Sequence, residues 1–176
     1  IILGMRDGED PLSAFPKPVR HAPIRVNFTS SFGGKNIVSF PEGVQLPSYT
    51  SVKDAIDDLP VLANGEASDE EYRTPPQNDY QKVMRSGSEC VLNHEAARLG
   101  KVNLERLQYI RPGGNWTDIP HDLLPKGMQR ARRTDHTKRY GRVEPDGLAS
   151  TILTKCDPHW GAYFHYDQDR AFTVRE

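Results

Sequence analysis

The sequence predicts an α+β protein that is rich in loops. Only 36% of its 176 residues are hydrophobic, so we expect one modest core. Its 14 glycines and 14 prolines interrupt the chain often, which favours short elements joined by turns. The apolar residues alternate in some segments and follow a helical period in others. We therefore expect short strands and short helices rather than a helical bundle.

Residues 1–50 are expected to hold two short strands within long loops. Residues 1–5 are an apolar run typical of a buried strand, and residues 24–29 alternate apolar and polar side chains. The segment between them contains four prolines, which disfavour regular structure. Residues 30–50 are rich in Gly, Ser and Pro, so we expect them to be irregular too.

The clearest helix signal is "SVKDAIDDLP" at residues 51–60. Ser51 is a candidate N-cap with Asp54 three residues later, which is the spacing of a capping box, and a proline ends the pattern. The apolar stripe consists of Val52, Ala55, Ile56 and Leu59. Asp57 and Asp58 are then expected on the solvated face of this helix rather than as an acid-base pair.

Three more helices are predicted after an exposed acidic linker at residues 63–78. They cover residues 79–87, 94–99 and 101–110, and Gly100 separates the last two. Their apolar positions are expected to be core rather than catalytic: Ala96, Leu99, Val102, Leu107 and Ile110.

The last third of the chain is expected to be a turn followed by strands. "RPGGNWTDIP" at residues 111–120 predicts a tight turn that presents Trp116. "LASTILTK" at residues 148–155 and "AYFHYD" at residues 162–167 have strand patterns, and residues 172–176 begin a third element.

The charge distribution indicates a polyanionic partner, although the formal net charge is only -1. Residues 42–71 carry eight acids and one lysine, whereas residues 126–142 carry seven bases and one acid, a local charge of +6. We call residues 126–142 the basic segment. It suits contact with nucleic-acid phosphates, with Trp116 or Tyr140 available for stacking. The alternative for Trp116 is a packing anchor. A merely solvated basic face is the alternative.

The two cysteines do not identify a metal or catalytic site. Cys90 with His94, and Cys156 with His159, could together supply four zinc ligands, but one cysteine per half is weak evidence. Nothing fixes His159 as a base for Cys156, so a packed thiol is the simpler interpretation. With no disulfide framework and no apolar run of membrane-spanning length, the sequence predicts an intracellular protein with no membrane partner.

Residues 141–155, "GRVEPDGLASTILTK", and residues 164–176, "FHYDQDRAFTVRE", resemble the ninth and tenth motifs of the DNA (cytosine-5) methyltransferases. The shared pattern is Arg, Asp-Gly and Thr, followed by Asp-Arg and Thr-Val-Arg-Glu. Residues 51–60, 75–87 and 111–120 resemble segments between the eighth and ninth motifs, and the opening "IILGMR" resembles the end of the eighth. The resemblance thus covers nearly all of the chain.

The resemblance implies a small target-recognition domain together with edge elements of a Rossmann-like methyltransferase sheet. Residues 1–50 would be the end of the catalytic-sheet region with loops, residues 51–141 the target-recognition region, and residues 142–176 the ninth motif and the start of the tenth. In this family a Cys thiolate attacks a flipped cytosine, and S-adenosylmethionine supplies the methyl group to C5. The host compartment would be a bacterial cytoplasm or a eukaryotic nucleus.

The chain lacks the motifs that carry this chemistry in the family. It contains no Pro-Cys dipeptide, no Glu-Asn-Val and no Phe-x-Gly-x-Gly loop, and Cys90 and Cys156 follow Glu and Lys. We therefore expect no catalytic, cofactor-binding or metal-binding residue here, and no methylation by this chain alone. Its partners would be double-stranded DNA and a missing N-terminal catalytic half, which would bind S-adenosylmethionine.

The residues expected to contact DNA belong to the basic segment and the ninth motif: Arg130, Arg132, Arg133, Lys138, Arg139, Arg142, Thr151 and Lys155. Arg142 has a second interpretation, because its guanidinium could instead bond main-chain carbonyls and pack the ninth motif against the sheet. For the whole chain, the alternative function is a stand-alone nucleic-acid-binding module without catalysis.

Overall fold

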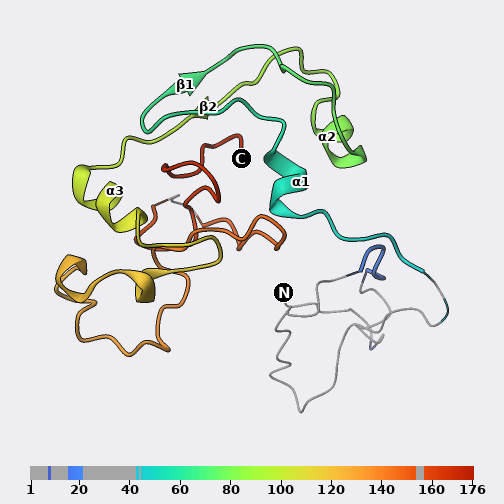
Figure 1. Ribbon diagram of the computed structural model, residues 1–176. Helices are drawn as coiled ribbons and strands as arrows, with labels where there is room; N and C mark the ends of the chain where they lie inside the picture. The colour runs from blue at the N-terminus through green and yellow to red at the C-terminus, as the bar shows by residue number, and fades with distance from the viewer. Residues whose placement is uncertain (1–7, 9–15, 22–42, 44, 154–156) are drawn as a thin grey trace. The chain divides into compact units, whose positions relative to one another are not determined.

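The computed structural model describes residues 8, 16–21, 43, 45–153 and 157–176, which form two compact units, residues 1–49 and 50–176 (Figure 1). In the first unit, the main-chain N–H of His21 donates to the carbonyl of Pro47 at 2.9 Å. The strands predicted at residues 1–5 and 24–29 lie outside the described residues.

Helix α1, Val52–Ile56, confirms the clearest sequence prediction. The Ser51 hydroxyl accepts the Asp54 N–H at 3.0 Å, and the Asp54 carboxylate accepts the Ser51 N–H at 3.0 Å. This reciprocal capping box satisfies two main-chain donors that a helix start leaves unpaired. Val52 and Ile56 are buried, so the predicted apolar stripe does face a core.

Helices α2, Asp79–Met84, and α3, Lys101–Leu107, confirm two further predictions. Asn78 caps α2 by accepting the N–H of Gln81 at 2.9 Å, and Gly100 precedes α3. Two short 3-10 helices follow: η2, Trp116–Asp118, and η3, His121–Leu123. No helix in the described part of the chain is long and apolar enough to span a membrane.

Helix α2 packs on α1 through polar contacts that the sequence pattern did not indicate. The side-chain amide of Gln81 donates to the main-chain carbonyl of Asp54 at 2.9 Å. Arg85 forms an ion pair with Asp58 at 3.3 Å, and the Asp58 side chain is only 3% exposed. The prediction that Asp58 lies on a solvated face is therefore wrong, because α2 covers it.

The predicted helix at residues 94–99 is wrong, because this segment pairs with the acidic linker. Strand β1, Ala67–Ser68, runs antiparallel to β2, His94–Glu95, with Ser68 opposite His94 (Figure 1). The buried His94 ring contacts the Pro60 carbonyl at 2.8 Å through Nε2 and the Thr173 hydroxyl at 3.1 Å through Nδ1. These long-range contacts outweigh the local helical pattern.

No strand forms among the described residues of the last third of the chain. Residues 148–153 have no regular structure, and residues 154–156 lie outside the described part. Around Phe164 there are only isolated bridges, to Arg142 and to Ala171. The predicted strands at 148–155 and 162–167 are thus not found, and residues 172–176 form neither helix nor strand.

The core of this unit consists of two hydrophobic clusters. The larger one joins α3 and the 111–120 turn to the C-terminal segment: Leu99, Leu107, Ile110, Trp116, Ile119, Leu124, Met128, Tyr140, Phe164 and Ala171. The smaller one packs α1 against Val143. Four of the five predicted core positions at residues 96–110 are buried, but Val102 is 52% exposed, because it faces away from the cluster. In its described part the protein is α+β, with short helices and one two-stranded sheet.

Candidate nucleic-acid interface

The basic segment is a series of turns rather than a helix or a strand. Main-chain bonds link Ala131 to Met128 at 3.1 Å, Asp135 to Arg132 at 2.8 Å, and Arg139 to His136 at 2.9 Å. The φ angles of His136 and Tyr140 are 54° and 48°, in the left-handed region that few residues with a side chain adopt. The chain therefore reverses direction repeatedly, so neighbouring side chains leave it in different directions.

Trp116 anchors this series of turns from inside. Its ring N–H donates to the Asp135 carbonyl at 3.1 Å, and its main-chain N–H donates to the Arg139 carbonyl at 3.0 Å. Trp116 is 3% exposed and Tyr140 is 4% exposed. Both side chains are therefore packing anchors, which is the second interpretation of Trp116. The prediction that either ring is available for stacking is wrong, because the core covers both rings.

The buried apolar side chains of the basic segment pack in the core, whereas most of its cations are exposed at the surface. The exposed ones are Lys126, Arg130, Arg132, Arg133 and Lys138. None of these five forms an ion pair within the described part of the chain. Unpaired surface cations keep their full attraction for an anionic partner, whereas those in salt bridges are partly neutralised.

Arg139 is half-buried and lies over an aromatic side chain. Its guanidinium carbon is 4.8 Å from the ring centroid of Trp160. Trp160 is 53% exposed, in clear contrast to Trp116. No sequence pattern indicated a role for Trp160, since its neighbours His159 and Gly161 show no basic pattern and only the fold brings it next to Arg139.

Arg142 is engaged within the protein. Its Nε donates to the carbonyls of His165 and Tyr166 at 3.0 and 3.1 Å, and its Nη1 donates to the Ile110 carbonyl at 3.3 Å. Its Nη2 also pairs with Asp169 at 3.1 Å. This geometry favours the second interpretation of Arg142, in which its guanidinium bonds main-chain carbonyls.

The remaining predicted contact residues are Thr151 and Lys155. Thr151 is exposed, and Lys155 lies outside the described residues. Five cations of the basic segment are thus exposed on turns that Trp116 anchors, whereas Arg142 is bonded to main-chain carbonyls.

A hydrogen bond between buried Tyr140 and half-buried His159 joins the basic segment to the turn at residues 157–160. The Tyr140 hydroxyl lies 2.9 Å from Nδ1 of His159. Burial and the nearby guanidinium of Arg139 lower the pKa of His159, so this imidazole is neutral at pH 7 and can accept the hydroxyl proton. Burial raises the pKa of Tyr140, which keeps its hydroxyl protonated. The pair is a structural link.

The cysteine and histidine residues do not form a metal site in the described part of the chain. No group of three or more His, Cys, Asp or Glu side chains there could hold a metal ion. The His94 ring is used in the contacts to Pro60 and Thr173 described above, and Cys156 lies outside the described residues.

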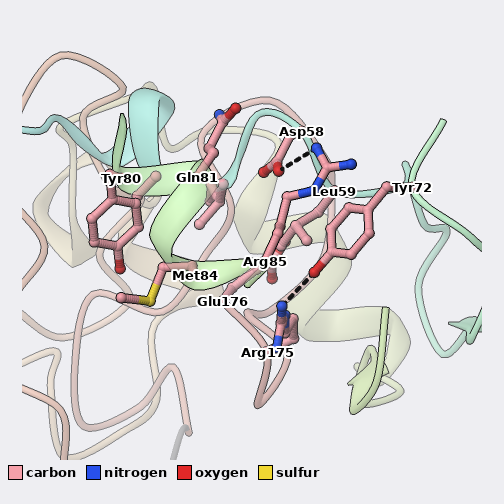
Figure 2. A pocket seen from close by; sticks show the side chains of 11 residues that line it. Asp58, Leu59, Tyr72, Tyr80, Gln81, Met84, Arg85, Arg175 and Glu176 are labelled. Atoms are coloured by element: carbon pink, nitrogen blue, oxygen red, sulfur yellow. Dashed lines mark hydrogen bonds and ion pairs between the residues drawn. The ribbon is translucent and has the colours of Figure 1, made fainter. Parts of the chain in front are cut away.

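A small pocket lies between α1, α2 and the end of the chain (Figure 2). Asp58, Arg85, Tyr72 and Arg175 lie around it, and Figure 2 shows the Asp58–Arg85 ion pair and the hydrogen bond from Arg175 to the Tyr72 hydroxyl. The Arg85 guanidinium also stacks 3.8 Å above the Tyr72 ring. The pocket volume is about 100 Å³, well below the roughly 300 Å³ of the smallest usual ligand sites, so S-adenosylmethionine does not fit it.

Comparison with known proteins identifies the family. The chain is 40% identical over 148 residues to the type II methyltransferase M.DdeI of Desulfomicrobium norvegicum, covering 81% of this chain and 34% of that protein. It is 31% identical over 188 residues to DNA (cytosine-5)-methyltransferase 1B of Oryza sativa subsp. japonica, covering 97% of this chain and 12% of that protein. The chain belongs to the DNA (cytosine-5) methyltransferase family.

A third relative is DNA (cytosine-5)-methyltransferase 2 of Arabidopsis thaliana, which is 28% identical over 197 residues. This match covers 100% of the chain and 13% of that protein. No family model matches the chain. It spans between a tenth and a third of the length of the relatives it matches. Its resemblance to the family, inferred from short motifs, is thereby confirmed.

Proposed function

We propose that the chain is the target-recognition and C-terminal part of a DNA (cytosine-5-)-methyltransferase. The parent enzyme would transfer a methyl group from S-adenosylmethionine to C5 of a flipped cytosine in double-stranded DNA. The single observation that carries the proposal is the set of five exposed cations in the basic segment, none of which forms an ion pair with a described residue, in a chain of this family.

The residues of this chain would bind and orient the duplex. Exposed arginines and lysines of the basic segment would contact phosphates, which position a protein on DNA without reading its sequence. Lys126 joins the predicted contacts, because it is exposed like Arg130, Arg132, Arg133 and Lys138, whereas Arg142 would support the surface from below. Thr151 and Lys155 remain predicted contacts.

The chemistry would come from a partner half that supplies the nucleophile and binds the cofactor. S-adenosylmethionine would supply the methyl group there, and the pocket of about 100 Å³ in this chain does not fit it. Neither cysteine follows a proline. We therefore expect no transfer of labelled methyl groups to DNA by the isolated chain, and transfer when the catalytic half is added. Methylation by the chain alone would contradict the proposal that a partner half supplies the chemistry.

The test of DNA binding is the salt dependence of duplex affinity. About six phosphate contacts predict a slope near -5 in a plot of log affinity against log salt. Replacing Arg130, Arg132 and Arg133 together by alanine should reduce the magnitude of that slope by about 3. Fluorescence anisotropy of a labelled duplex measures both quantities.

The matched control replaces Lys53, Lys82 and Lys101, which are exposed cations outside the basic segment. This triple alanine variant has the same net charge as the first, so an effect of overall charge would appear equally in both. We expect the control to keep the wild-type slope. Equal losses in the two variants, or a wild-type slope near zero, would reject the proposed interface.

A stand-alone nucleic-acid-binding module is the second candidate, and the absence of a Pro-Cys dipeptide from the chain favours it. Both candidates predict the same salt dependence. They differ in the mixing experiment: a stand-alone module would bind the duplex but give no methyl transfer with any added catalytic half.

A further inference from the structure

Trp160 differs from the other tryptophan of the chain in its surroundings. Trp116 is 3% exposed within the larger core cluster, whereas Trp160 is 53% exposed at the edge of the basic segment. A single exposed apolar side chain is common on protein surfaces and needs no explanation by itself. What distinguishes Trp160 is how firmly the fold holds it beside a cation.

The turn that carries Trp160 is fixed to the end of the basic segment. The N–H of Tyr140 donates to the Pro158 carbonyl at 2.6 Å, and the N–H of Gly141 donates to the Gly161 carbonyl at 3.3 Å. Within the turn, the N–H of Trp160 donates to the Asp157 carbonyl at 2.8 Å. Bonds on both sides of Trp160 therefore set its position relative to the cations.

Two side chains orient the indole ring. Arg139 lies over it, with its guanidinium carbon 4.8 Å from the ring centroid. The His159 ring meets it edge-on, at a centroid distance of 5.0 Å and an interplanar angle of 88°. The surface that these two groups leave uncovered accounts for the exposure of Trp160. A flat aromatic surface held beside a guanidinium and next to unpaired cations combines the two groups that bind unstacked nucleotides.

We propose that Trp160 and Arg139 form a base-contacting platform at the end of the basic segment. A DNA base that has left the stack packs on the exposed indole surface, and Arg139 holds the ring in place and attracts the adjoining phosphate. This inference rests on the proposed function, because the platform needs DNA on the basic segment. It adds that the surface contacts a base and not only phosphates.

Tryptophan fluorescence of the full 176-residue chain provides the test, because stacking on a base quenches indole emission. We expect a duplex with one mismatched cytosine to quench emission more than the fully paired duplex, since a mismatched base leaves the stack at lower cost. Inorganic polyphosphate carries the charge but no bases, and it should bind without quenching. The Trp160→Phe variant should lose the quenching with both duplexes, because Trp116 is buried.

Affinity supplies a second measurement. Trp160→Ala should weaken binding of the mismatched duplex by about 5- to 150-fold, which corresponds to the loss of one base contact, and should leave the salt slope unchanged. Trp160→Phe should keep most of the affinity, since it retains an aromatic ring. The thermal midpoint of each variant, followed by circular dichroism, checks that the fold is intact.

The outcomes separate this inference from the proposed function. A salt-dependent wild type with no quenching, and with an unchanged affinity in Trp160→Ala, would overturn the platform and leave the interface standing. Quenching by polyphosphate equal to that by DNA would also overturn it. Absence of any duplex binding by the wild type would reject both.

Discussion

At the scale of single residues, a buried ion pair links Arg170 to Glu176 at the two ends of residues 170–176. Arg170 has no exposed surface, and its guanidinium meets the two carboxylate oxygens of Glu176 at 2.6 and 2.7 Å. Burial alone would raise the pKa of Glu176, but the bonds from Arg170 outweigh it and the pKa is lowered. Both residues belong to the motifs on which the family resemblance was based, and the structure shows that here they are partners in packing.

His165 sits beside this ion pair as a neutral ring. Its Nδ1 accepts the main-chain N–H groups of Asp167 and Gln168, both at 3.1 Å, so that nitrogen carries no proton. Burial, with a further contribution from Arg170, lowers the pKa of His165 to about 4, although Glu176 opposes the shift. The turn at residues 165–168 therefore depends on an unprotonated imidazole.

This arrangement predicts a loss of stability in mild acid. The His165 imidazole of the unfolded chain takes up a proton near pH 6.5, whereas that of the folded chain resists until about pH 4. Its contribution is therefore present above pH 6.5 and is lost as the pH falls toward 4, by on the order of 3 kcal/mol. Urea unfolding at pH 7, 5.5 and 4.5 measures the decline in the free energy of unfolding.

The matched control is His165→Asn, whose side-chain oxygen can accept the same two N–H groups but does not titrate in this range. We expect the decline between pH 6.5 and 4.5 to be clearly smaller in this variant, with the other histidines contributing equally to both proteins. Identical pH profiles would show that His165 is not the responsible group.

At the scale of elements, the correct predictions were those with a local physical cause. Helix α1 has its capping box and α2 has its Asn78 cap, so the signals lie within a few residues of each helix start. The segment at residues 94–99 has a helical pattern too, but His94 is held extended by Pro60 and Thr173. Because these contacts join residues far apart in the sequence, a local sequence pattern does not indicate them.

The junction between residues 141 and 162 gives a test at this scale. A Cβ at Gly141 would lie 2.5 Å from the Ala162 Cβ and 2.8 Å from its Cα, closer than any real contact. We expect Gly141→Ala to destabilise the chain by about 1–3 kcal/mol, because the main chain must move apart. Thermal unfolding followed by tryptophan emission reports the change.

Gly127→Ala is the control for that substitution. Nothing lies within 4 Å of a Cβ at Gly127, so the added methyl group has no clash. The free energy of unfolding of this variant should equal that of the wild type or exceed it by up to about 1 kcal/mol. The gain arises because alanine restricts the conformations of the unfolded chain. Equal stability of the two variants would argue against the close approach at Gly141.

At the scale of the whole molecule, the buried hydrophobic side chains of the described residues all lie between Val52 and Ala171. They fall within the compact unit of residues 50–176. We therefore expect a chain of residues 50–176 to unfold cooperatively, with a midpoint within about 3 °C of that of the full chain. Circular dichroism and tryptophan emission should show coincident transitions. A non-cooperative transition would show that residues 1–49 are needed for this fold.

The sequence by itself determined the family, the helix starts and the place of the positive charge. Capping residues, the run of bases at residues 126–142 and the short ordered motifs are all local properties, so they can be read without coordinates. The charge of the basic segment is also independent of the fold, although its exposure is not.

Only the tertiary structure decided which aromatic side chain faces solvent and which arginine bonds to main-chain carbonyls inside the protein. Trp116 and Tyr140 lie in the core because long-range packing covers their rings, whereas Trp160 lies at the surface beside Arg139. Arg142 donates to carbonyls of segments more than 20 residues away in the sequence. Burial and hydrogen-bond partners are set by contacts between distant segments, and a linear pattern does not contain them.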